Sequence, residues 1–433
     1  MTPRQPRSQL SGRALAVLAV IGLALAACQP TASPAPSASP TTGTPAPSPA
    51  AEASPKPTQN PEAIYAAIED EVVSIRGLTP KNPVDPKVLD DAGIRKVTEE
   101  GFRKDNPRDL VEANERLLKG LGLLEPEASL EDLYIKLLGD QVAGLYSPDD
   151  KQLYVVSRSG ALGPTEKSTF SHEFTHALQD QNFDLSSLDL SEVGEGDRGI
   201  ARLALVEGDA TLAMTYWQLA NLGQMELLQM LGESLNPEVT ASLDAMPAVL
   251  RESLLFPYTG GLAFVQALQT SGGWGAVNDV YKSPPASTEQ ILHPEKYVAG
   301  ETPVDVTVPT DLAAKMGDGW KVGLEDTLGE FQLKVWLEQA PKADGGPSAA
   351  RAADGWGGDR VALLDGPDGA WAIALNTAWD TPEDATEFIA AARRAVDALP
   401  NGGTVEATSA TDVSVVLASD AGLVERLGAA LGD

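Results

Sequence analysis

The chain has 433 residues, of which 42% are hydrophobic, and its formal net charge at pH 7 is −30. This length and apolar content are sufficient for two or three domains with cores of their own. The strong negative charge disfavours a nucleic-acid partner, because phosphate contacts require a basic surface. Because the chain contains one cysteine, an internal disulfide framework is excluded.

The first 28 residues have the pattern of an export signal. Three basic residues (Arg4, Arg7 and Arg13) precede an apolar run over residues 14–27, which is shorter than a membrane-spanning helix requires. The run ends in Leu-Ala-Ala-Cys28, which resembles a bacterial lipobox, so we expect cleavage before Cys28 and lipid attachment to its thiol. An ordinary secretory signal next to an incidental cysteine is the alternative. The lipobox predicts an exported lipoprotein anchored to the outer face of the cell membrane.

Residues 29–60 are rich in Pro, Ala, Ser and Thr and contain almost no large apolar side chain, which predicts a disordered tether. Apolar residues then recur at helical spacing over residues 62–75, 88–103 and 108–121, and Ser129 is placed to cap a fourth helix. Residues 142–156 alternate around a Ser-Pro-Asp-Asp turn, as in a β-hairpin. Together with the helices expected at 165–181 and 199–222, these elements predict a mostly helical domain with a small β-sheet over residues 61–302.

The pattern changes after about residue 301. Short apolar runs at 360–364 and 370–376 flank an Asp-Gly-Pro-Asp-Gly turn, and Thr381 is placed to cap a helix. Two further strand-like runs, 403–407 and 413–418, precede a last helix. We therefore predict a separate C-terminal α+β domain over residues 303–433, and an α+β fold class for the whole chain.

The helix expected at 165–181 carries the sequence His172-Glu173-Phe174-Thr175-His176. Histidines four residues apart project from one helix face, which suits two ligands of a tetrahedral Zn2+. Glu173 is placed to take a proton from water activated by the metal. Phe170, Phe174, Ala177 and Leu178 have core spacing, so we expect an amphipathic helix with its histidines on the polar side.

A catalytic zinc needs a third protein ligand and an open position. The metzincin pattern requires Gly and His where this chain has Gln179 and Asn182, so that class is excluded. Glu207 is the strongest candidate, because it lies in an otherwise apolar helix where an unpaired carboxylate would be costly to bury. Glu192 and Glu195 are weaker candidates in a polar loop.

Three further residues have open assignments. Asp180 shares the histidine face one turn on, and could orient a ligand or be a solvated acid at the helix end. His293, in a polar loop beside a proline, could stabilise the oxyanion of a tetrahedral intermediate or be a structural histidine. Tyr258 is the rival oxyanion donor, with packing as its alternative role.

The His-Glu-Phe-Thr-His motif followed by Glu207-Gly208-Asp209-Ala210 resembles the gluzincin zinc metallopeptidases of the peptidase MA-like clan. With the later string Ser-Thr-Glu-Gln-Ile-Leu-His-Pro-Glu-Lys-Tyr, the chain looks like an uncharacterised group of bacterial lipoproteins in that clan, over roughly residues 130–300. The resemblance implies His172, His176 and Glu207 as zinc ligands and Glu173 as base, and a hairpin strand that pairs with the peptide substrate. The chain departs from some gluzincins at Thr211, where they have an Asp that orients a histidine.

These observations predict a zinc metallopeptidase that acts on a peptide or protein substrate. Two other functions remain open at this point. The chain could be a catalytically silent lipoprotein of the zincin fold that binds a protein partner. It could also hold a structural zinc, for which His293 would have to be the fourth ligand, since no cysteine is available.

Overall fold

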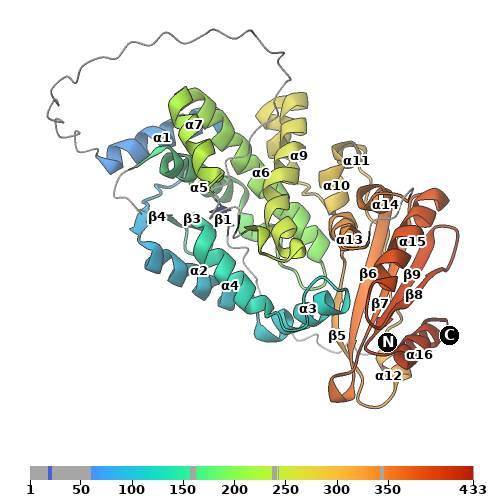
Figure 1. Ribbon diagram of the computed structural model, residues 1–433. Helices are drawn as coiled ribbons and strands as arrows, with labels where there is room; N and C mark the ends of the chain where they lie inside the picture. Colours follow the sequence, from blue (N-terminus) through green and yellow to red (C-terminus); the bar gives the residue numbers. More distant parts are fainter. Residues whose placement is uncertain are drawn as a thin grey trace, which may run out of the picture.

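The computed structural model describes residues 18–21, 60–156, 162–236, 241, 243–341 and 346–432 (Figure 1). The predicted lipidation site Cys28 lies outside these residues, as does the predicted tether apart from Asn60. Of the predicted signal segment, residues 18–21 are described, and they form strand β1. Within the described part of the chain, no helix is both long and apolar enough to cross a bilayer.

The part of the chain before residue 303 is mostly helical and contains one small sheet, as predicted. Its elements are β1 (Leu18–Ile21), α1 (Pro61–Arg76), β2 (Lys87–Leu89), α2 (Asp91–Asp105), α3 (Arg108–Gly120), α4 (Leu130–Gln141), β3 (Val142–Ser147), β4 (Gln152–Val156), α5 (Pro164–Phe183), the 3-10 helix η1 (Leu185–Leu188), α6 (Gly196–Asn221), α7 (Gln224–Ser234), α9 (Ala248–Val280), α10 (Thr288–Leu292) and α11 (Pro294–Ala299).

The small sheet has the strand order β1-β3-β4-β2. β3 and β4 form the predicted antiparallel hairpin, with Leu145 opposite Tyr154. β2 joins β4 in parallel, and β1 pairs antiparallel with the other edge of β3. The helix expected to begin at residue 88 therefore starts later, after the N-cap Asp90, whose side chain accepts a hydrogen bond from the backbone N–H of Gly93.

The C-terminal part is α+β, as predicted, and is built on a five-stranded antiparallel sheet of order β5-β6-β7-β9-β8 (Figure 1). Its elements are α12 (Leu312–Met316), β5 (Lys321–Asp326), α13 (Gly329–Glu338), α14 (Ala349–Ala353), β6 (Trp356–Asp365), the 3-10 helix η2 (Pro367–Gly369), β7 (Trp371–Trp379), α15 (Pro382–Asp397), β8 (Gly403–Ala407), β9 (Asp412–Ala418) and α16 (Ala421–Gly432).

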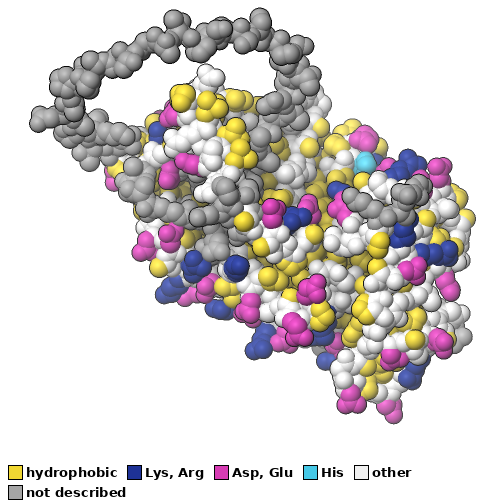
Figure 2. Space-filling view, in the orientation of Figure 1, with side chains coloured by type: hydrophobic (Ala, Val, Ile, Leu, Met, Phe, Trp, Pro, Cys, Tyr) yellow, Lys and Arg dark blue, Asp and Glu magenta, His cyan; other side chains and the backbone are white. Residues whose placement is uncertain are grey.

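Both faces of the C-terminal sheet are covered, and alternate residues of each strand face opposite sides. On β6, Leu363 packs on the side of α13 and α15, whereas Leu364 packs on the side of α12 and α16. The apolar cluster on the α13 and α15 side continues without a break into α3, α6 and α9. The two regions of the chain therefore share a core, while the division predicted at residues 302 and 303 stays a prediction. On the face drawn in Figure 2, acidic and basic side chains are interspersed.

Helices α6 and α9 approach each other through two glycines. A Cβ added at Gly208 would lie 2.2 Å from the backbone of Gly261, and one added at Gly261 would lie 2.1 Å from the carbonyl oxygen of Ala204. These contacts are between backbones, so a rotamer change cannot relieve them. The close crossing fixes the position of α6, on which Glu207 is the residue before Gly208.

We expect Gly208→Ala to destabilise the protein by about 2–4 kcal/mol, because the added methyl group must push the two helix backbones apart. Urea unfolding of the parent and the variant measures this difference. Gly232→Ala in α7 is the matched control, since no atom lies within 4 Å of its added Cβ and helix propensity favours alanine. A Gly208→Ala protein as stable as the parent would show that α6 and α9 have room for a methyl group where they cross.

Candidate metal centre

Helix α5 carries the predicted metal motif and is buried on all sides around it. It begins after Gly163 with Pro164 in its first turn, a position where proline needs no hydrogen-bond donor. Phe170 and Phe174 pack in an apolar cluster with α1 and the β3–β4 hairpin, as their spacing predicted. The face that carries the histidines is buried as well. The helix is therefore not amphipathic in the expected sense of one apolar side and one polar side. That face lies against α6 and α9 instead of solvent.

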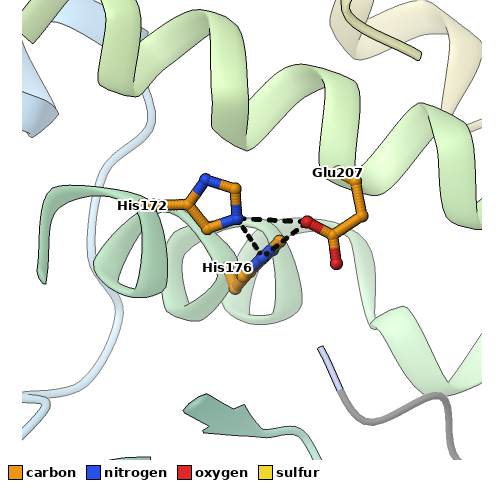
Figure 3. A group of neighbouring side chains, drawn as sticks. All are labelled: His172, His176 and Glu207. Atoms are coloured by element: carbon orange, nitrogen blue, oxygen red, sulfur yellow. Dashed lines mark hydrogen bonds and ion pairs between the residues drawn. The ribbon is translucent and has the colours of Figure 1, made fainter. Parts of the chain in front are cut away.

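The structure brings together the three predicted ligands (Figure 3). Nε2 of His172 lies 2.9 Å from Nε2 of His176 and 3.1 Å from Oε2 of Glu207. Nε2 of His176 lies 3.4 Å from the same carboxylate oxygen. All three side chains are at most 2% exposed. Helices α5 and α6 thus direct two imidazole nitrogens and one carboxylate oxygen to a single point.

This donor set fits a divalent metal ion. Ligands at about 2.0–2.1 Å from a tetrahedral Zn2+ lie about 3.3 Å from one another. The three separations of 2.9, 3.1 and 3.4 Å are close to that edge length. Two imidazoles and one carboxylate leave the fourth position of a tetrahedron for water or substrate, which is the arrangement of catalytic rather than structural zinc sites.

The electrostatics of the group also favour a bound cation. Burial and the neighbouring His176 lower the pKa of His172 to about 4. Burial acts to lower the pKa of His176 too, but the Glu207 carboxylate outweighs it and raises that pKa to about 9. At neutral pH a proton on His176 therefore balances the charge of Glu207, and a metal ion would displace that proton.

Glu173 and Tyr258 flank the three ligands. The Glu173 side chain is buried and lies against strand β3, because a Cβ added at Gly144 would be 3.1 Å from Cγ of Glu173. The ring of Tyr258 on α9 is 6.2 Å from the ring of His172. Burial and the nearby Glu207 and Glu173 carboxylates raise the pKa of Tyr258, so its phenol remains a hydrogen-bond donor.

A chain of buried polar contacts orients His176. Nδ1 of His176 donates to Oε1 of Gln179 over 2.8 Å, and the amide nitrogen of Gln179 donates to Oδ2 of Asp209 over 3.0 Å. Asp209 also accepts from Tyr281 and forms a two-point ion pair with Arg76, with both side chains of the pair fully buried. Because Gln179 accepts the Nδ1 proton, Nε2 of His176 is left to face the metal position.

This chain of contacts was not predicted from the sequence. Gln179 follows His176 by three residues, so helical spacing alone could have indicated it. Arg76 and Tyr281 are 133 and 72 residues from Asp209, and no local pattern connects them. Thr211, which occupies the place where some gluzincins have an orienting Asp, is buried, and its hydroxyl oxygen has no hydrogen-bond partner among the described residues.

Asp180 and His293 make their contacts with groups other than the three metal ligands. Asp180, the candidate for orienting a ligand, accepts hydrogen bonds from Tyr146, Lys151 and the backbone of Leu185, so it ties α5 to the hairpin instead. His293 ends helix α10 and bonds to Glu330 on α13 over 3.0 Å. The imidazole of His293 therefore contacts the C-terminal region, and the choice between His293 and Tyr258 as the oxyanion donor stays a prediction.

The two weaker ligand candidates lie at the start of α6. Glu195 is the N-cap residue of the helix, and both Glu192 and Glu195 pair with Arg198. Neither belongs to the group of three ligand atoms around His172.

Comparison with known proteins gives two matches. Residues 320–431 match a family model described as a domain of unknown function, DUF8575. This match lies within the predicted C-terminal domain and does not reach the metal centre. A crystal structure from Chloroflexus aurantiacus, described as a proposed hydrolase with a novel fold, aligns with 55% of this chain and 88% of its own, at 18% identity and a TM-score of 0.37. No curated protein matches the chain.

We expect Gln179→Ala to weaken zinc binding by about 10–100-fold, because His176 loses the partner that fixes its orientation and tautomer. Competition with a chromophoric chelator measures the affinity. Gln181→Ala is the matched control on the same helix, since Gln181 bonds to the backbone of Lys81 and Asn82. Equal affinities of the Gln179→Ala variant and the parent would mean that Gln179 does not orient the ligand.

Proposed function

We propose that this chain is a zinc-dependent metallopeptidase. The observation that carries the proposal is the convergence of His172, His176 and Glu207 on one point, with Glu173 buried beside them. Zinc held at these ligands would supply a Lewis acid that polarises the substrate carbonyl and makes water more acidic. The residues around it account for the remaining requirements of peptide hydrolysis.

Proton transfer is assigned to Glu173. Its carboxylate accepts a proton from the attacking water as the new C–O bond forms, and delivers it to the leaving amine as the C–N bond breaks. The phenol of Tyr258 donates a hydrogen bond to the carbonyl oxygen as negative charge develops there. The position of Tyr258 beside Glu207 and the rise in its pKa support this role over one in packing alone.

Strand β3 is the proposed place for the substrate backbone. It lies beside Glu173, and its outer edge pairs antiparallel with residues Leu18–Ile21 in the described chain. An extended peptide could make the same backbone hydrogen bonds along this edge. If residues 1–27 are removed on export, as we propose, the edge becomes available to a substrate.

Replacing Glu173 separates metal binding from catalysis. We expect Glu173→Gln to hold zinc like the parent but to cleave casein about 10²–10⁴ times more slowly, because the general base is lost. Zinc content and casein cleavage are measured on the purified chain from which residues 1–27 have been removed. Glu166→Gln, in the first turn of α5, is the control, since its side chain caps Gly163 and glutamine keeps an acceptor there.

Two outcomes of this experiment would contradict the proposal. Parent protein that holds one zinc ion but cleaves no member of a broad peptide set would favour the silent binding protein. Glu173→Gln protein that cleaves at the parent rate would remove Glu173 from the mechanism.

We further propose that Cys28 anchors the chain to the outer face of the cell membrane. Cys28→Ser should abolish incorporation of labelled fatty acid and move the protein from the membrane fraction to the soluble fraction. Labelling and fractionation of cells that express the parent and the variant provide the test. A labelled Cys28→Ser protein would place the lipid elsewhere.

A further inference from the structure

A second group of ligand-type side chains lies where the helical region meets the C-terminal region. It consists of His293 at the end of α10, Glu330 in α13 and Asp354 at the end of α14. Nε2 of His293 is 3.0 Å from Oε1 of Glu330 and 3.8 Å from Oδ1 of Asp354. Two atoms that are each about 2.1 Å from one ion can be at most about 4.2 Å apart, so both separations permit a shared metal.

The Glu330 carboxylate is only partly compensated for its burial, through the contact of its Oε1 atom with His293. Its side chain is 6% exposed, and its Oε2 atom has no hydrogen-bond partner among the described residues. A buried carboxylate oxygen without a donor is costly, so a cation beside Glu330 would be stabilised. Among the described residues, Glu330 forms an ion pair only with His293, and a protonated His293 would leave the group of His293, Glu330 and Asp354 at a net charge of −1.

A neighbouring group of three carboxylates is neutralised by a lysine side chain and serves as a comparison. Glu289, Glu301 and Asp380 also converge, but Nζ of Lys296 lies at their centre, 2.6–2.8 Å from each. In the described chain, no lysine or arginine lies within 4 Å of Glu330 or Asp354. The group of His293, Glu330 and Asp354 thus has candidate ligand atoms but no lysine ammonium group among them.

We propose that His293, Glu330 and Asp354 bind a second divalent metal ion, which links the helical region to the C-terminal region. One nitrogen and two carboxylate oxygens suit Zn2+ or Mn2+, with water completing the shell. Asp354 is 49% exposed and His293 is 26% exposed, which leaves a route for the ion and room for water. The ion would replace the direct contact between His293 and Glu330 and bring positive charge to the buried carboxylate of Glu330.

The test counts bound Zn2+ in the full chain by equilibrium dialysis at micromolar Zn2+. We expect two ions per parent chain and one ion in each of His293→Gln and Asp354→Asn. Glu207→Gln, which damages the first site, should retain the ion at the second. Glutamine at residue 293 can still donate to Glu330, and Asp354 is half exposed, so both variants should fold, as circular dichroism of the metal-free proteins would verify.

The control is Glu295→Gln, because Glu295 is 76% exposed and lies 3.7 Å from Nδ1 of His293 without belonging to the proposed ligand group. It should bind two ions. One ion in the parent that Glu207→Gln loses, or two in folded His293→Gln protein, would overturn the proposal and leave the His293–Glu330 contact as an ion pair only. Loss of an ion in Glu295→Gln would overturn it too, since surface acids would then hold that ion. The count does not depend on cleavage, so it stands apart from the test of peptidase activity.

Discussion

A carboxylate removed from water must meet positive charge or several hydrogen-bond donors, and the middle of helix α6 buries two carboxylates. Asp209 is matched permanently by Arg76, which also stacks on Trp274 with its guanidinium carbon 4.5 Å from the ring centre. Glu207, two residues earlier, meets the imidazoles of α5, where a proton or a metal ion can lie between them, and it also lies beside Tyr258. Asp209 is thus neutralised by a fixed arginine, and Glu207 by a cation that can exchange. Glu207 is therefore suited to binding a metal ion, and Asp209 is suited to holding Gln179 in place.

Much of the metal centre could be predicted from sequence because its strongest signal is local. His172 and His176 are four residues apart on one helix, and the helical period alone puts them side by side. Glu207 required a further physical argument, namely the cost of an acid in an apolar helix. The contacts of Gln179 with Asp209 and of Asp209 with Arg76 depend on how α1, α5 and α6 pack, and no spacing in the chain encodes that packing.

The secondary structure shows the same difference between elements that depend on local sequence and elements that depend on distant contacts. The hairpins and the capped helices were predicted, since alternation, turn residues and Thr381 act within a few residues. Strand β5 was not predicted, because its place at the sheet edge depends on pairing with β6 across about 40 residues of chain. His293 shows the same limit. Its loop and neighbouring proline suggested a functional histidine, but only the docking of α13 decides which carboxylate it meets.

Helix α6 also explains why the C-terminal region belongs to the framework of the metal centre. At its start, the backbone of Gly196 donates to Asp326 and that of Asp197 donates to Thr327, both next to the C-terminal sheet. Asp197 accepts in turn from Thr288 in α10. Further along the same helix, Gly208 seats against α9 and Glu207 faces the histidines. Because a helix transmits displacement along its axis, a shift of the C-terminal sheet would move the third ligand relative to the first two. The metal ion that we propose at His293, Glu330 and Asp354 would hold this junction, and so would stabilise the candidate metal centre through the rigidity of α6.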